Sequence, residues 1–119
     1  MKENVIQSKA FQFSLLIIEL YKKLIIEKEF ILSKQLLRSA TSIGANIEEA
    51  NAGISKKEFI SKLSISSKEA RETRYWLRLY QESNLTSIIV EKELEAVEEI
   101  IRILTAIVKT SQTKQKESI

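Results

Sequence analysis

The chain has 119 residues, a formal net charge of +3 and no histidine, cysteine, proline or aspartate. These absences exclude histidine- or cysteine-based nucleophilic catalysis, thiolate or imidazole zinc sites, and aspartate-based calcium sites. With two glycines, the chain also lacks a glycine-rich phosphate loop. Composition therefore favours a non-enzymatic protein without cofactor or metal, and its mild basic excess is compatible with an anionic partner.

The first predicted helix has apolar residues on two opposite faces. One face repeats at helical steps through Ile6, Ala10, Phe13, Ile17, Leu20 and Leu24. Phe11, Leu15 and Ile18 lie across the helix from it. Crowded packing inside one bundle could absorb these three residues. Because opposite faces cannot both meet one core, we expect instead that they lie in a subunit interface. A loop at residues 27–32 follows.

The second predicted helix is expected to start with Ser33 as its N-cap and to end at Gly53 in the left-handed conformation. Its apolar seam consists of Leu36, Ala40, Ile43, Ile47 and Ala50. A polar line that includes Gln35 and Asn46 flanks this seam.

The third predicted helix begins at a capping box, Ser55 to Glu58, and closes at Asn84. Its seam consists of Phe59, Leu63, Ser66, Ala70, Thr73, Leu77 and Tyr80.

Two carboxylates, Glu69 and Glu72, lie beside the third seam. If the second and third helices form a hairpin, Arg38 lies level with Glu69, and Gln35 lies level with Glu72. We expect a structural ion pair between Arg38 and Glu69, because a carboxylate among apolar neighbours is costly unless it is paired. The alternative is a catalytic or metal-binding role for the two carboxylates, which the absence of histidine disfavours.

The third predicted helix is basic, with seven Lys or Arg against four Glu between residues 56 and 83. One face away from the seam carries Lys57, Lys68, Arg71, Tyr75 and Arg78, with Arg74 nearby. Such a face can neutralise phosphates, and Tyr75 can stack on a base. The alternative is an ordinary solvated face.

The fourth predicted helix follows a cap at Thr86 or Ser87. Its seam consists of Val90, Leu94, Val97, Ile101, Leu104 and Val108. A second apolar line with Ile100, Ile103 and Ile107 widens its apolar arc, so these residues are further candidates for the subunit interface. The acidic side chains of this helix are expected on a surface separate from the basic face; they are Glu91, Glu95, Glu98 and Glu99.

Four seams joined by short connections predict an all-α, antiparallel up-and-down four-helix bundle. A single domain is expected over residues 1–110, followed by a polar, disordered tail at residues 111–119. The apolar run at residues 15–18 is too short to span a bilayer, so no membrane is expected as a partner and cytoplasm is the default location.

Two segments carry a family resemblance: residues 37–50 (LRSATSIGANIEEA), and KEFISKL, KEARET and WL between residues 57 and 77. They resemble the small four-helix-bundle proteins encoded within bacterial 23S rRNA intervening sequences, over nearly the whole chain. Glu48 and Ala50 stand where Ala and Gly are frequent in that family. The family is similar to the accessory variability protein of diversity-generating retroelements, a basic homopentamer that binds nucleic acid and a reverse transcriptase. The resemblance therefore implies a homopentamer and contact with nucleic acid.

Three functions compete on this basis. The favoured hypothesis is an oligomeric accessory protein that binds RNA, or less favourably DNA, through the basic face. The alternative is a structural scaffold that binds a protein partner without touching nucleic acid. An enzyme using Glu69, Glu72 and Tyr75 is the least supported. Salt dependence separates the first two, because phosphate contacts release counterions.

Overall fold

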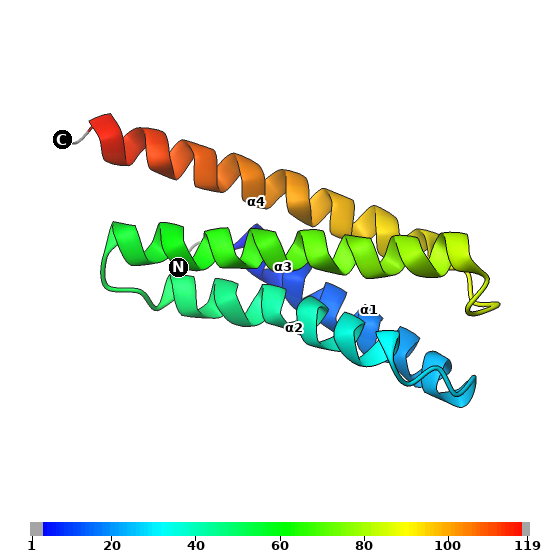
Figure 1. Ribbon diagram of the computed structural model, residues 1–119. Helices are drawn as coiled ribbons and strands as arrows, with labels where there is room; N and C mark the ends of the chain where they lie inside the picture. The colour runs from blue at the N-terminus through cyan, green and yellow to red at the C-terminus, as the bar shows by residue number, and fades with distance from the viewer. Residues whose placement is uncertain (1–3, 118–119) are drawn as a thin grey trace.

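Four α-helices follow one another in the computed structural model, which describes residues 4–117. They are α1 (Val5–Ile26), α2 (Leu32–Asn51), α3 (Lys56–Ser83) and α4 (Glu91–Glu117). Each helix runs antiparallel to the one before it, and α4 returns along α1 (Figure 1). The bundle is elongated, with extents of 53 × 25 × 21 Å. The predicted all-α four-helix bundle is confirmed.

The four predicted seams meet in the centre of the bundle. Their residues are buried except Phe59 and Val108, which are half-buried and pack against the core from its edge. Polar atoms between α2 and α3 are satisfied there. The hydroxyls of Ser39 and Thr73 are 2.8 Å apart, and the hydroxyl of Ser66 donates to the carbonyl of Ile43 at 2.8 Å. Small side chains thus let α2 and α3 pack closely without leaving these hydroxyls unpaired.

The start of α2 is capped from outside the helix. The carboxylate of Glu29 accepts the backbone N–H groups of Ile31, Leu32 and Ser33 at 3.0, 3.1 and 2.8 Å, and it also accepts the hydroxyl of Tyr80. The predicted cap at Ser33 is wrong, because Ser33 is buried inside the helix and its hydroxyl donates to the carbonyl of Glu29. One carboxylate thus satisfies several of the free amides that begin a helix.

Replacing Glu29 by glutamine is expected to destabilise the fold in a pH-dependent way. Burial raises the pKa of the Glu29 carboxyl, but hydrogen bonds from Tyr80 and three amides hold that pKa below its ordinary value of 4.5. The stabilisation is therefore complete above this value and is lost as the pH falls through the lower folded pKa. Urea unfolding at pH 7 should show a loss of about 0.5–2 kcal/mol.

The difference between Glu29→Gln and the parent should shrink as the pH falls below 4.5 and through the lower folded pKa, because the Glu29 carboxylate of the parent becomes protonated. Glu19→Gln serves as the control, because the Glu19 side chain is 64% exposed. A deficit that keeps its size as the pH falls would contradict the proposed capping by the ionised carboxylate.

The turn between α2 and α3 differs from its prediction at one residue. Gly53 has no positive φ, and its N–H donates to the carbonyl of Ala50 at 3.1 Å, so the predicted left-handed glycine is wrong. The next boundaries are confirmed. The hydroxyl of Ser55 accepts the N–H of Glu58 at 3.1 Å, and Asn84 closes α3 with a φ of 58°.

The last helix starts later and ends later than predicted. Thr86 and Ser87 do not cap it, because their hydroxyls donate to the carboxylate of Glu27 at 2.8 and 3.0 Å. These bonds lower the pKa of Glu27 and tie the α3–α4 connection to the α1–α2 turn. The expected disordered tail is helical up to Glu117, and residues 118–119 lie outside the described residues. No glycine or proline interrupts this segment, and Lys114 and Lys116 suit a helix C-terminus.

Candidate nucleic-acid interface

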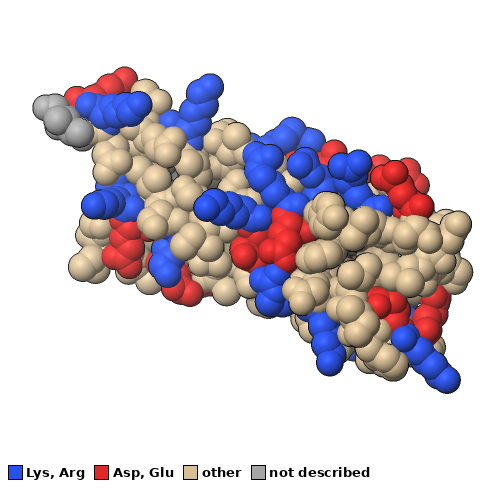
Figure 2. Space-filling model, viewed as in Figure 1, with Lys and Arg blue, Asp and Glu red and all other residues tan. Residues whose placement is uncertain are grey.

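The predicted basic face follows the length of α3. Its residues are Lys57, Lys68, Arg71, Tyr75 and Arg78, and all five are exposed. Arg74 lies beside them and is half-buried. Lys and Arg side chains gather over the middle of the bundle, with acidic side chains beside and below them (Figure 2). Five of the six predicted contact residues are thus exposed along α3, and acidic side chains of α3 and of other helices lie near them.

Ion pairs separate the cations of the bundle into two groups. Pairs between neighbouring helices join Arg38 to Glu69 and Glu72, Lys62 to Glu49, and Lys9 to Glu99. On the basic face, Arg78 lies 3.7 Å from Glu82 of its own helix, and both side chains are more than 60% exposed. Within residues 4–117, the other four cations of this surface form no ion pair: Lys57, Lys68, Arg71 and Arg74. No direct ion pair neutralises these four charges, although Arg74 shares a depression with glutamates of α4.

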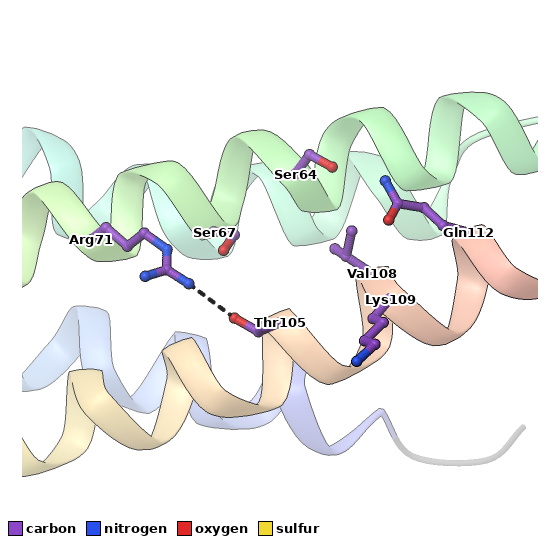
Figure 3. A pocket seen from close by; sticks show the side chains of 7 residues that line it. All are labelled: Ser64, Ser67, Arg71, Thr105, Val108, Lys109 and Gln112. Carbon is purple, nitrogen blue, oxygen red and sulfur yellow. Dashed lines mark hydrogen bonds between the residues drawn. The ribbon is translucent and has the colours of Figure 1, made fainter.

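A pocket opens between α3 and α4 beside Arg71 (Figure 3). The Arg71 guanidinium donates from Nη2 to the hydroxyl of Thr105 at 3.2 Å, which joins the two helices across the pocket. The volume is about 250 Å³. The lining comes from Ser64, Ser67 and Arg71 of α3 and from Thr105, Val108, Lys109 and Gln112 of α4. One residue of the predicted basic face thus belongs to a two-helix site.

Lys109 is a candidate binding residue that the sequence reasoning missed. The five glutamates between residues 91 and 99 give the fourth helix an acidic character, so the basic charge of its second half is easily overlooked. From residue 102 onward, that helix has four cations and a single glutamate, which is the signal that could have found Lys109. Because α3 and α4 are antiparallel, this basic half of α4 lies beside the first half of α3.

The acidic half of α4 lies beside the second half of α3. Glu91, Glu95 and Glu98 line a depression that they share with Arg74 and Arg78. The expectation that these glutamates lie on a separate surface is therefore wrong for all three. Glu99 lies elsewhere, 3.2 Å from Lys9 of α1. The helical period places residues around one helix, whereas the register between two helices decides which charges meet.

Tyr75 presents an aromatic ring on the basic face, about one helical turn beyond Arg71 along α3. Its side chain is 55% exposed. The ring meets that of Trp76 edge to face, with centroids 5.3 Å apart and an interplanar angle of 66°. Trp76 is anchored in turn, because its indole N–H donates to the carboxylate of Glu72 at 3.0 Å. This arrangement supports the Tyr75 ring from one side and leaves ring surface open for stacking.

Arg38 of α2 joins the two carboxylates that lie beside the α3 seam. Its guanidinium contacts Glu69 at 3.2 Å and also pairs with Glu72, while its Nε donates to the side chain of Gln35 at 3.4 Å. Asn46 does not take part, because its amide donates to the carbonyl of Ser42 within α2. Since Glu69 is partly buried at 20% exposure, the pair fixes the register of α2 against α3.

Glu69→Gln is expected to destabilise the protein more than Glu95→Gln. The first change removes a charge that Arg38 binds across two helices, whereas Glu95 forms no ion pair within the described chain. Because Arg38 is half exposed, the expected difference is about 1 kcal/mol. Thermal unfolding of the two variants measures it. Equal melting temperatures would show that the pair does not hold α2 against α3.

The predicted interface residues divide between the surface and the core. Phe11 and Leu15 are 60% and 44% exposed on the outer side of α1, and Ile18 beside them is half-buried. Ile103 and Ile107 are half-buried against the core. The expectation for Ile100 is wrong, because this residue is 1% exposed. It packs inside its own bundle because α4 contacts both α1 and α3, which broadens its buried arc.

Metal-binding clusters and membrane-spanning helices are both missing from residues 4–117. No group of three or more carboxylates in this part of the chain is placed to hold a metal ion. None of the four helices combines the length and apolar character needed to cross a membrane.

Known proteins resemble the chain in sequence and in fold. The family described as 23S rRNA-intervening sequence protein matches residues 2–108. The crystal structure of a Bacteroides thetaiotaomicron protein of unknown function, from the S23 ribosomal protein family, is 44% identical with a TM-score of 0.81. That similarity covers 87% of this chain and 98% of the other. The comparison with curated proteins gives no match.

Proposed function

The chain belongs to the 23S rRNA-intervening sequence protein family, and we propose that it is a non-enzymatic accessory protein that binds RNA through the basic face of α3. The proposed contact residues are Lys57, Lys68, Arg71, Arg74, Tyr75 and Arg78. The observation that carries the proposal is the group of four cations on this surface that no carboxylate of the described chain pairs with.

Binding would rest on phosphate contacts. Exposed lysines and arginines displace the counterions of an RNA backbone, so affinity falls steeply with salt and carries little base specificity. Tyr75 adds a stacking surface that only an unpaired base can reach. Glu91, Glu95 and Glu98 repel phosphates beside Arg74 and Arg78, so the phosphate contacts are expected to be stronger at Lys57, Lys68 and Arg71 than at those two arginines.

Gel shifts of the parent protein with single-stranded and duplex RNA, at low and moderate salt, test the proposal. We expect binding at low salt that weakens steeply as salt rises. Tyr75→Ala should weaken the binding of single-stranded RNA about fivefold or more, and the binding of duplex RNA by less. Tyr75→Phe keeps the ring and should bind like the parent. Absence of binding at low salt would overturn the proposal in favour of a scaffold that binds a protein partner.

We further propose that the protein acts as a ring of five copies. Association between copies is supported by the exposed side chains of Phe11 and Leu15 on α1, beside the half-buried Ile18, with the half-buried Ile103 and Ile107 of α4 as additional contacts. The number five rests on the resemblance to the homopentameric accessory protein of diversity-generating retroelements. Contiguous apolar surface of this kind is unusual on a monomer. Cyclic repetition would also multiply a basic face that is weak in one copy.

Light scattering should report a mass five times that of the 13.7 kDa chain. Phe11→Glu combined with Leu15→Glu should lower the mass to that of one chain, because each copy would bury two new charges in the ring. Ile54→Glu is the matched control, since Ile54 is 96% exposed at the α2–α3 turn and should leave the mass unchanged. A monomeric parent at micromolar concentration would contradict the ring.

A further inference from the structure

The pocket between α3 and α4 is lined by hydrogen-bond donors and has no carboxylate. Arg71 and Lys109 supply two positive charges, and Ser67, Thr105 and Gln112 supply hydroxyl and amide groups. Neither Ser67 nor Gln112 makes a side-chain hydrogen bond within residues 4–117. These donors are therefore available to an acceptor that enters the pocket.

The neighbouring depression on the same pair of helices provides an internal comparison. It combines Arg74 and Arg78 with three glutamates, so its cations already face negative charge. The pocket beside Arg71 has the opposite balance, with two cations and no anion in its lining. Of these two depressions, the one beside Arg71 has a net positive charge that an anion can neutralise.

The Arg71 guanidinium is held in position at the pocket. The hydroxyl of Thr105 accepts from one of its nitrogens at 3.2 Å, which leaves the remaining N–H groups of the planar fork for a ligand. A fixed fork suits the oxygens of a phosphate, which it binds through two parallel hydrogen bonds. Figure 3 shows Arg71 reaching from α3 toward Thr105 of α4.

We propose that this pocket binds one phosphate group. Arg71 and Lys109 provide the charge, Ser67 and Gln112 donate to the phosphate oxygens, and Thr105 acts as a positioning residue for Arg71. The inference rests on the proposed function for its biological ligand, because the phosphate would be one unit of the RNA backbone. The pocket then fixes where the RNA crosses from α3 to α4.

Titration of the intact protein with inorganic phosphate, at constant ionic strength set by sodium chloride, tests the pocket directly. Amide chemical shifts should move at Ser67, Arg71, Thr105 and Gln112 and reach saturation, while those of Glu95 and Glu98 stay unchanged. Lys109→Gln should weaken the binding of phosphate about tenfold. Lys114→Gln removes the same charge outside the pocket lining and should bind like the parent.

Thr105 provides the test of positioning. Thr105→Val removes the hydroxyl and should weaken the binding of phosphate about threefold. Thr105→Ser keeps a hydroxyl and should bind phosphate like the parent. Melting temperatures of all variants are measured alongside, so a loss of binding is not mistaken for unfolding. Uniform small shifts without saturation, or equal affinity in Lys109→Gln and the parent, would overturn the pocket.

Measuring RNA binding by the same variants distinguishes the phosphate pocket from the proposed function. If the proposed function and the phosphate pocket are both right, inorganic phosphate competes with RNA. Lys109→Gln then weakens the binding of RNA, while Lys114→Gln does not. RNA binding without a phosphate response in the pocket overturns the pocket and leaves the proposed function standing. A phosphate response without RNA binding overturns the proposed function and leaves a site for a small phosphate-bearing ligand.

Discussion

Reversing Lys68 and Arg71 to glutamate together is expected to abolish RNA binding. Both side chains are exposed at the centre of the basic face, and neither forms an ion pair in the described chain. The double change replaces two attractive charges by two repulsive ones. Because it removes at least two cations that would neutralise phosphates, any residual binding should show a salt dependence shallower by about 1.4 in log–log slope for single strands.

The fold should tolerate this reversal. Exposed substitutions usually change stability by about 0.5 kcal/mol or less, and the reversal breaks a single hydrogen bond between helices, the one that Arg71 donates to Thr105. Lys23→Glu combined with Lys34→Glu is the matched control, because it changes the net charge equally on exposed positions of α1 and α2. Equal RNA affinity in the two double variants would show that net charge, and not the α3 face, determines binding.

Leu77→Ala is expected to lower the free energy of unfolding by about 2–5 kcal/mol. Leu77 is 0% exposed in α3 and belongs to the central cluster that all four helices share. Truncation removes buried apolar surface and leaves a cavity that close-packed neighbours fill only in part. Urea unfolding of the parent and the variant measures the loss.

Leu85→Ala makes the same chemical change at a position that is 49% exposed in the α3–α4 connection. It should cost about 0.5 kcal/mol or less. Similar unfolding midpoints for the two leucine variants would mean that Leu77 does not occupy the centre of the core.

The core was predictable because the spacing of apolar residues within each helix is enough to determine which of its faces is buried. Apolar residues at helical steps face one direction whatever the neighbours are, so Ile17, Ile43, Leu77 and Leu104 are buried as expected. Ile100 marks the limit of this reasoning. Its place on a second apolar line is compatible with either a subunit interface or a broad core, and only the packing of α4 against two helices decides between them.

Helix starts proved less predictable than helix faces. Local rules succeed at Ser55, whose partner is three residues away. They fail at Ser33, where the Glu29 side chain four residues earlier caps the helix in place of the serine, and at Thr86, whose hydroxyl donates to Glu27, 59 residues away along the chain. Glu29 also binds Tyr80, which is 51 residues away along the chain. The bonds from Tyr80 to Glu29 and from Thr86 to Glu27 depend on tertiary contacts, so they cannot be predicted from a window of a few residues.

The candidate site was predictable only where it lies on one helix. The exposed row from Lys57 to Arg78 follows from the period of α3 alone. The proximity of Lys109 to Arg71, and of Glu95 to Arg74, depends on how far α4 is rotated and shifted along α3. The cations are therefore predictable from the sequence, but which of them have acidic neighbours is not.

The division of charge along α4 gives the bundle an electrical polarity. Its first nine residues carry five glutamates, while its second half is basic, and the helix runs along a molecule 53 Å long. A dipole of this orientation experiences a torque in the field of a polyanion before any contact forms. If the protein binds RNA as proposed, the basic end of α4 and the first half of α3 turn toward the approaching strand. The kinetic consequence is a faster encounter at low ionic strength, expressed in the association rate more than in the lifetime of the complex.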